Sequence, residues 1–236
     1  MKTVNESDGL TVKPSKKPVR VDAHYVSHEI QHLLHFEAGF LFTVRELLLK
    51  PGKSVQEFLF DDRSKYVKPI VFLIFTSVIF TLIAHYFHVD YSLFNIDKIE
   101  PLKGKVRSKE IGEWTDSHIG YTNLVMGVFI ALWVKLFFRK HDHNIFEITI
   151  LLCFVLGEAI LCLGLFLTVA IVFNSSIPAL IGVSFYIIYP IWAIGQFFGE
   201  RKVTNYVKSA LTYVLGNVSY LATLILLAYI LKIVTS

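Results

Sequence analysis

Long apolar runs separated by short polar connections fill the chain from residue 69 onward. Each run holds about 18 or more residues, which is the length that a helix needs to cross roughly 30 Å of hydrocarbon. The pattern predicts an all-α polytopic membrane protein with about five transmembrane helices, and a polar stretch at 89–119 is expected to form an outer loop. The predicted spans are residues 69–87, 120–138, 145–173, 177–198 and 207–233.

The first 68 residues are polar and basic, and their pattern changes near residue 22. Residues 1–21 have few bulky apolar side chains and predict a disordered basic tail that is attracted to anionic lipid headgroups. Residues 22–68 predict cytoplasmic interfacial amphipathic helices, with a helix ending at Pro51-Gly52 and another starting near Val55. Ser54 and Glu57 have the spacing of a capping box. Three parts are therefore expected: 1–21, 22–68 and the transmembrane domain 69–236.

Composition supports a membrane location, and the placement of basic residues predicts the orientation. The chain is 54% hydrophobic and 18% charged, and its mean hydropathy is +0.55, which is too apolar for an ordinary soluble domain. Eleven of the 23 Lys and Arg precede the first span, and three lie at each of the second-to-third and fourth-to-fifth junctions. By the positive-inside rule, the N-terminus is expected in the cytoplasm and the C-terminus outside a bacterial inner membrane.

Polar side chains inside the apolar runs are the first candidates for function. Glu158 lies about eleven residues into the third run, hence about 16 Å deep, where a charge is expensive. Asn217 and Tyr186 or Tyr189 reach similar depths, so we expect an intramembrane polar layer. His143 and Glu147 lie below Glu158 on the same helix and suggest an ion or proton path. The alternative is a protonated Glu158 that hydrogen-bonds a neighbouring helix.

A second group of candidates lies on the predicted helix that follows the tail. Four histidines with helical spacing share one face, and they suit a metal ion or a pH switch. An interfacial helix whose polar face happens to be rich in histidine is the competing interpretation, because no cysteine or firmly placed carboxylate completes a ligand set. These residues are His24, His28, His32 and His35.

One string of residues resembles a known family. The segment from Phe36 to Ile74 resembles bacterial membrane proteins grouped as domain of unknown function 3667. The residues that carry the resemblance are Gly39, Thr43, Leu47, Leu48, Pro51, Gly52, Arg63, Tyr66 and Pro69. Many members begin with a Cys-rich zinc ribbon, which is lacking here because the two cysteines are Cys153 and Cys162. The resemblance implies a polytopic membrane protein and carries no activity.

These observations predict a non-enzymatic membrane protein that acts as a scaffold or as a regulatory or accessory partner of a cytoplasmic or membrane protein. No nucleophile elbow, phosphate-binding loop or zinc-protease motif is present in the sequence, and no cofactor is expected. An ion or proton channel or small-solute transporter around Glu158 is the alternative, and a metal- or pH-responsive sensor is a weaker one. The expected partners are the lipid bilayer and a protein or a second copy of the chain. Nucleic acid is not expected.

Overall fold

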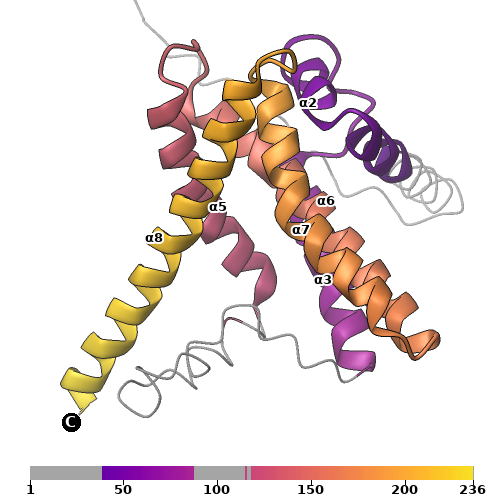
Figure 1. The fold of residues 1–236 in the computed structure, drawn as a ribbon, viewed down its shortest axis with the longest axis vertical. Helices are drawn as coiled ribbons and strands as arrows, with labels where there is room; N and C mark the ends of the chain where they lie inside the picture. Colours follow the sequence, from indigo (N-terminus) through magenta and orange to yellow (C-terminus); the bar gives the residue numbers. More distant parts are fainter. Residues whose placement is uncertain (1–38, 88–114, 116–117, 236) are drawn as a thin grey trace, which may run out of the picture. The chain divides into compact units, whose positions relative to one another are not determined.

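The computed structural model describes residues 39–87, 115 and 118–235, and its regular structure is helical throughout these residues (Figure 1). All of them belong to one compact unit, Ala38–Ser236. Residues 39–49 are helical. The further helices are α2 (Pro51–Phe60), α3 (Pro69–Tyr86), α5 (Ile119–Phe137), α6 (Ile145–Val172), α7 (Ser176–Phe197) and α8 (Val203–Thr235).

Five of these helices are long and apolar enough to cross a membrane: α3, α5, α6, α7 and residues Val203–Ile230 of α8. The prediction of an all-helical protein with five spans is confirmed, and the chain is a multi-pass integral membrane protein. The helices coincide with the predicted runs, except that α8 begins at Val203 rather than near Val207. The tail 1–21, the histidine-bearing segment and nearly all of the loop 89–119 lie outside the described residues.

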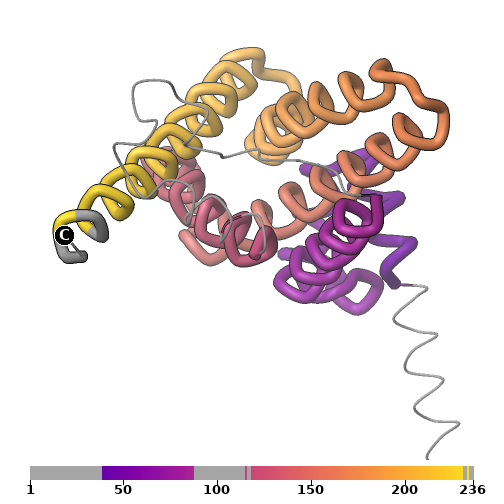
Figure 2. Tube along the Cα trace, turned by 90° about the horizontal axis from the view of Figure 1, so that it is seen from below, coloured from indigo at the N-terminus to yellow at the C-terminus, as the bar shows by residue number. Residues whose placement is uncertain are grey.

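Helix α6 is the centre of the bundle. It packs against α3, α5 and α7, and its residues from Leu151 to Gly164 are buried. Figure 2 shows α6 between α3 and α7, with α8 alongside α5. Trp133 of α5 donates a hydrogen bond to the hydroxyl of Ser219 of α8 over 2.9 Å. Side chains in this middle part of α6 therefore face protein, whereas α3, α5, α7, α8 and the two ends of α6 keep large apolar side chains exposed for lipid.

The predicted capping box at Ser54 and Glu57 is wrong. Helix α2 begins at Pro51, so Ser54 lies inside it and its hydroxyl donates to the carbonyls of Glu46 and Lys50. Proline at the first helical position has a suitable φ and no N–H to satisfy, which explains the earlier start. A capping box does form at the start of α6, where Asn144 and Glu147 bond each other's backbone N–H groups.

Candidate functional site

The residues that carry the family resemblance gather around one feature, the N-terminal helix pair, which consists of residues 39–49 and α2. Helix α2 packs against α7 and α6. In Figure 1 it lies beside the C-terminal end of α7, and this end of the bundle is called the α2 end below.

Pro51 creates a polar defect that a distant tyrosine repairs. The helix 39–49 ends before Lys50, so the Leu47 carbonyl is one of its last acceptors, and Pro51, four residues later, has no N–H to donate to it. The hydroxyl of Tyr189 in α7 donates to this carbonyl over 3.0 Å, in a buried position. The helix pair is thereby bonded to a residue that lies eight positions before the end of α7.

Gly52 allows two backbones to touch. A Cβ at this position would lie 2.4 Å from the backbone nitrogen of Phe197, a separation that real Cβ atoms do not reach. The Gly52 N–H donates to the side-chain oxygen of Gln196 over 2.8 Å, and the Gln56 side chain donates to the Phe197 carbonyl over 2.7 Å. A pair of hydrogen bonds and a glycine contact thus fix α2 on the end of α7.

The remaining residues of the family-like string hold the connection from α2 to α3. Thr43 donates to the Gly39 carbonyl and accepts the Val67 N–H over 3.1 Å. Arg63 donates to the carbonyls of Phe58 and Leu59 at the end of α2. Pro69 occupies the first turn of α3, where its missing N–H costs nothing. Each of these residues has a structural task.

Tyr66 joins the same connection to the core. Its hydroxyl donates to a carboxylate oxygen of Glu57 over 3.1 Å, and its ring packs edge-on against Phe42, Phe58 and Phe154. Burial raises the pKa of Tyr66, so the phenol stays protonated and keeps donating at physiological pH.

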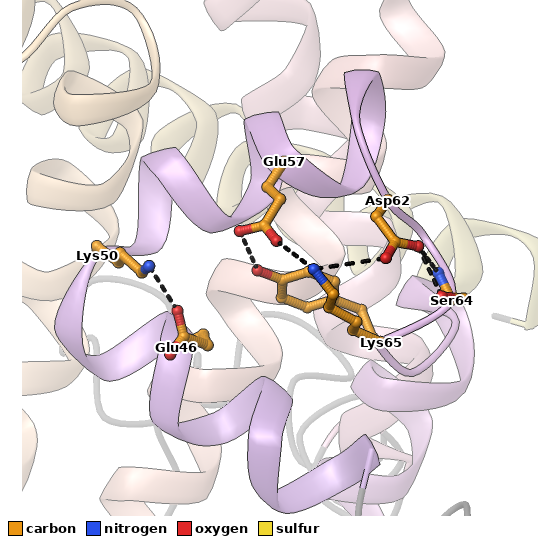
Figure 3. A network of polar contacts seen from close by, with 7 residues as sticks. Glu46, Lys50, Glu57, Asp62, Ser64 and Lys65 are labelled. Carbon is orange, nitrogen blue, oxygen red and sulfur yellow. Dashed lines mark hydrogen bonds and ion pairs between the residues drawn. The ribbon is translucent and has the colours of Figure 1, made fainter.

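Charged residues of the helix pair and of its connection to α3 form a network (Figure 3). Lys65 lies between Glu57 and Asp62, at 3.4 and 3.5 Å, and the hydrogen bond to Glu57 is the main reason why the pKa of Lys65 is raised. Two hydrogen bonds from Ser64 lower the pKa of Asp62. Exposed pairs such as these contribute little stability. The pKa shifts of Lys65 and Asp62 favour the charged forms of both side chains.

Histidines occupy the junction between α5 and α6. His143 Nδ1 lies 3.2 Å from Glu147 Oε2, and the His143 ring contacts those of Phe60, Phe197 and Phe198. The His143 carbonyl accepts from Lys135 over 2.6 Å. The neighbouring His141 is partly buried, and this burial, with the nearby His143 and lysines, lowers its pKa. The junction thus brings together side chains from α2, α5, α6 and α7.

The residues expected to form a polar layer divide between two places. Glu158 is fully buried, its Oε1 accepts from the Cys162 thiol over 3.7 Å, and its Oε2 has no partner among the described residues. Tyr189 bonds Leu47, as described above. Tyr186 instead donates to Asn123 over 3.4 Å, and Asn217 donates to the Tyr213 carbonyl within α8.

Sequence reasoning missed two members of this second group, Asn123 and Tyr213. Pro190 deprives the Tyr186 carbonyl of its helical donor, and the Tyr213 hydroxyl donates to it over 3.3 Å. Asn123 is fully buried, and its Nδ2 has no partner in the described part of the chain. Two features of the sequence could have indicated this group: the single amide side chain in the second apolar run, and the proline four residues after Tyr186.

Apolar side chains lie between the two ends of the suggested path from His143 to Glu158, whose role stays a prediction. Glu147 and Glu158 share a face of α6, and the residues between them on this face are Leu151 and Phe154. Both are buried, and the Phe154 ring packs against Phe58 and Phe72. Apolar side chains thus separate the two carboxyl groups.

Within residues 39–87, 115 and 118–235, no three His, Cys, Asp or Glu side chains group closely enough to hold a metal ion. The four histidines at 24, 28, 32 and 35 lie outside these residues, so their predicted role stays a prediction.

Comparison with known proteins gives a family match over the N-terminal part of the described residues. Residues 37–81 match the model of a family described as protein of unknown function (DUF3667), which confirms the resemblance over this segment. The match covers the N-terminal helix pair, the connection and most of α3. No curated protein and no solved structure matches the chain.

Proposed function

We propose that this integral membrane protein is not an enzyme and acts as a scaffold or regulatory partner of another protein. This protein binds the exposed surface that α2, its connection to α3 and the end of α7 form together. The observation that supports this proposal is the rigid attachment of α2 to the end of α7, made by Gly52, Gln56 and the Lys53–Glu200 ion pair of 2.9 Å. A surface fixed in this way can present side chains without a conformational cost. Its exposed residues are Lys53, Phe60, Asp61, Arg63, Lys65 and Glu200.

The proposal includes an orientation. Six of the eleven basic residues that precede α3 are described, and they lie on the side of the α2 end, as do the basic groups at the α5–α6 and α7–α8 junctions. The six are Arg45, Lys50, Lys53, Arg63, Lys65 and Lys68. The positive-inside rule favours the cytoplasm for this side and a bacterial inner membrane for the protein, with the C-terminus outside. The partner would then be a cytoplasmic protein or the cytoplasmic part of a membrane protein. The basic tail would add attraction to anionic lipids, and a second copy of the chain is the other partner considered.

Site-specific photo-crosslinking in native membranes tests the partner. A photoreactive phenylalanine analogue at Phe60, Asp61 or Arg63 is expected to give one crosslinked species of the same mass at all of these sites. The matched control is Ile181, an exposed residue of α7 that faces lipid. If no site on the helix pair gives a species that Ile181 lacks, the proposal is wrong.

An ion or proton path is the second candidate, and the observation that favours it is the Oε2 of Glu158, which has no partner within the described part of the chain. A buried carboxyl group without a partner in the membrane is costly and is often functional. Replacement by glutamine keeps the shape and removes the ionisable group. Glu158→Gln should therefore abolish proton or ion flux in liposomes if Glu158 carries it, and unchanged flux would exclude this role. The buried Leu151 and Phe154 below Glu158 favour the scaffold.

A further inference from the structure

The length of α3 locates the edge of the hydrocarbon layer. Helix α3 has 18 residues, beginning at Pro69, and follows Lys65 and Lys68. At 1.5 Å per residue it is about 27 Å long, which is slightly less than the roughly 30 Å thickness of the hydrocarbon core. The whole of α3 must therefore lie in hydrocarbon, and the boundary passes near Pro69.

Residues 39–49 lie at this boundary, because Thr43 accepts the N–H of Val67, two residues before Pro69, and the Phe40 side chain reaches further into the hydrocarbon. The Phe40 ring lies 5.5 Å from that of Phe72 and 5.0 Å from that of Phe75, which are three and six residues into α3. These positions correspond to depths of about 4.5 and 9 Å. At the other end the Leu47 carbonyl binds Tyr189, which lies about 12 Å from the end of α7 by the same rise. The segment thus lies beside the bundle, within one leaflet.

The face of this segment that points away from the bundle is apolar and carries one arginine. Leu41, Arg45, Leu48 and Leu49 fall within about 100° of one another on a helix, and all four are exposed. Leu41 is 67% exposed and Leu49 is 62% exposed. The face continues the exposed apolar surface of α3, which includes Ile70, Ile74 and Phe75. A leucine face at this depth fits acyl chains, and an arginine can extend from it to a phosphate group.

We infer that residues 39–49 are embedded in the leaflet that contains the first turns of α3, and that their outer face binds phospholipid. Leu41, Leu48 and Leu49 contact acyl chains, and Arg45 pairs with the phosphate of an anionic lipid. Mean hydropathy does not signal this contact, because the segment is too short to span. The inference does not depend on a protein partner for α2, which concerns a different face of the pair.

Spin labels on the full chain in vesicles measure depth directly. Single cysteines replace Leu41, Leu48 or Leu49 in a Cys153→Ala/Cys162→Ala background, and each carries a nitroxide. The matched control is Lys53→Cys on α2, on the water side of the boundary. Vesicles contain phosphatidylcholine and phosphatidylglycerol. At the leucine sites oxygen should broaden or saturate the signal several-fold more effectively than a water-soluble nickel chelate, and at residue 53 the order should reverse.

Three outcomes separate the possibilities. Depth values inside the hydrocarbon at residues 41, 48 and 49 support the inference. Values equal to that of residue 53 would overturn it. Low access to both oxygen and nickel would indicate that protein covers the face, and would also overturn it. The labels replace exposed side chains, so the fold is preserved, and an unchanged melting temperature checks this.

Arg45 is tested by lipid selectivity. Spin-labelled phosphatidylglycerol should be immobilised by the protein more than spin-labelled phosphatidylcholine. Arg45→Gln should reduce this preference, whereas Arg45→Lys should retain part of it. Since the basic tail is identical in all three proteins, the difference reports on residue 45. The same preference in wild type and Arg45→Gln would refute the phosphate contact.

Discussion

At the scale of single residues, two tyrosine hydroxyls donate to backbone carbonyls that stand four residues before a proline. Pro51 and Pro190 each leave a carbonyl without its helical donor, and the hydroxyls of Tyr189 and Tyr213 supply one from another helix. In hydrocarbon no water can replace such a donor, so the tyrosines stabilise both the kinked backbone and the contact between helices.

Tyr189→Phe should destabilise the protein by about 1–3 kcal/mol, because the buried Leu47 carbonyl loses its partner. The measurement is the free energy of unfolding in mixed detergent micelles. Tyr229→Phe is the matched control, since Tyr229 is an exposed residue of α8. Equal stability of the two variants would show that the Tyr189 hydroxyl does not support the helix pair.

The two glycines of the family-like string should respond differently to alanine. Gly52→Ala would place a Cβ against the Phe197 backbone and should cost about 1–3 kcal/mol. A Cβ on Gly39 would meet its nearest atom, the Lys65 carbonyl oxygen, at an ordinary 3.7 Å, so Gly39→Ala should be close to neutral. Thermal unfolding of both variants checks this order. A larger loss for Gly39→Ala would contradict the described contact with α7.

At the scale of elements, the junction between α5 and α6 determines where the central helix begins. Asn144 accepts the Glu147 N–H over 2.9 Å and satisfies a donor that the first turn of α6 leaves free. Removing this acceptor by Asn144→Ala should cost about 1 kcal/mol, and Asn144→Asp should retain most of the stability. Unfolding free energies that rank the aspartate variant below the alanine variant would disprove the cap.

His141 makes the same junction sensitive to acid. Its pKa is lowered in the folded protein, mainly by burial, so below the ordinary histidine pKa of 6.5 the unfolded chain binds a proton that the folded chain does not. Stability is therefore complete above this pH and decreases as the pH falls below it. His141→Gln should flatten the decrease, as measured by melting temperature between neutral and mildly acidic pH. A variant with the wild-type slope would show that His141 does not cause the effect.

At the scale of the whole molecule, hydropathy was sufficient to predict the five spans, because lipid requires each to be continuous and apolar. The attachment of the helix pair to α7 could not be predicted, since Leu47 and Tyr189 are 142 positions apart. The local pattern gave a wrong prediction at Ser54, whose hydroxyl donates to the Glu46 carbonyl instead of capping α2. The family-like residues were found in the sequence, but their tasks in the connection to α3 needed the structure.

Truncation separates the tail from the helix pair. Removing residues 1–36 leaves every contact of the pair with α6 and α7, so insertion and melting temperature should be unchanged. Removing residues 1–66 exposes Tyr189 and the α7 end and should lower the melting temperature markedly. Equal stability of the two truncated proteins would mean that the pair does not belong to the folded bundle.

The contacts of α2 require the family-matched helix pair to stay fixed to the end of α7 in the membrane. The most direct measurement is crosslinking of Lys53→Cys and Glu200→Cys by a short bismaleimide in native membranes, in the Cys153→Ala/Cys162→Ala background. The 2.9 Å ion pair between these side chains predicts rapid intramolecular crosslinking, whereas a Lys53→Cys/Tyr229→Cys control should give none. Equally slow reaction of both cysteine pairs would contradict the attachment of α2 to the end of α7.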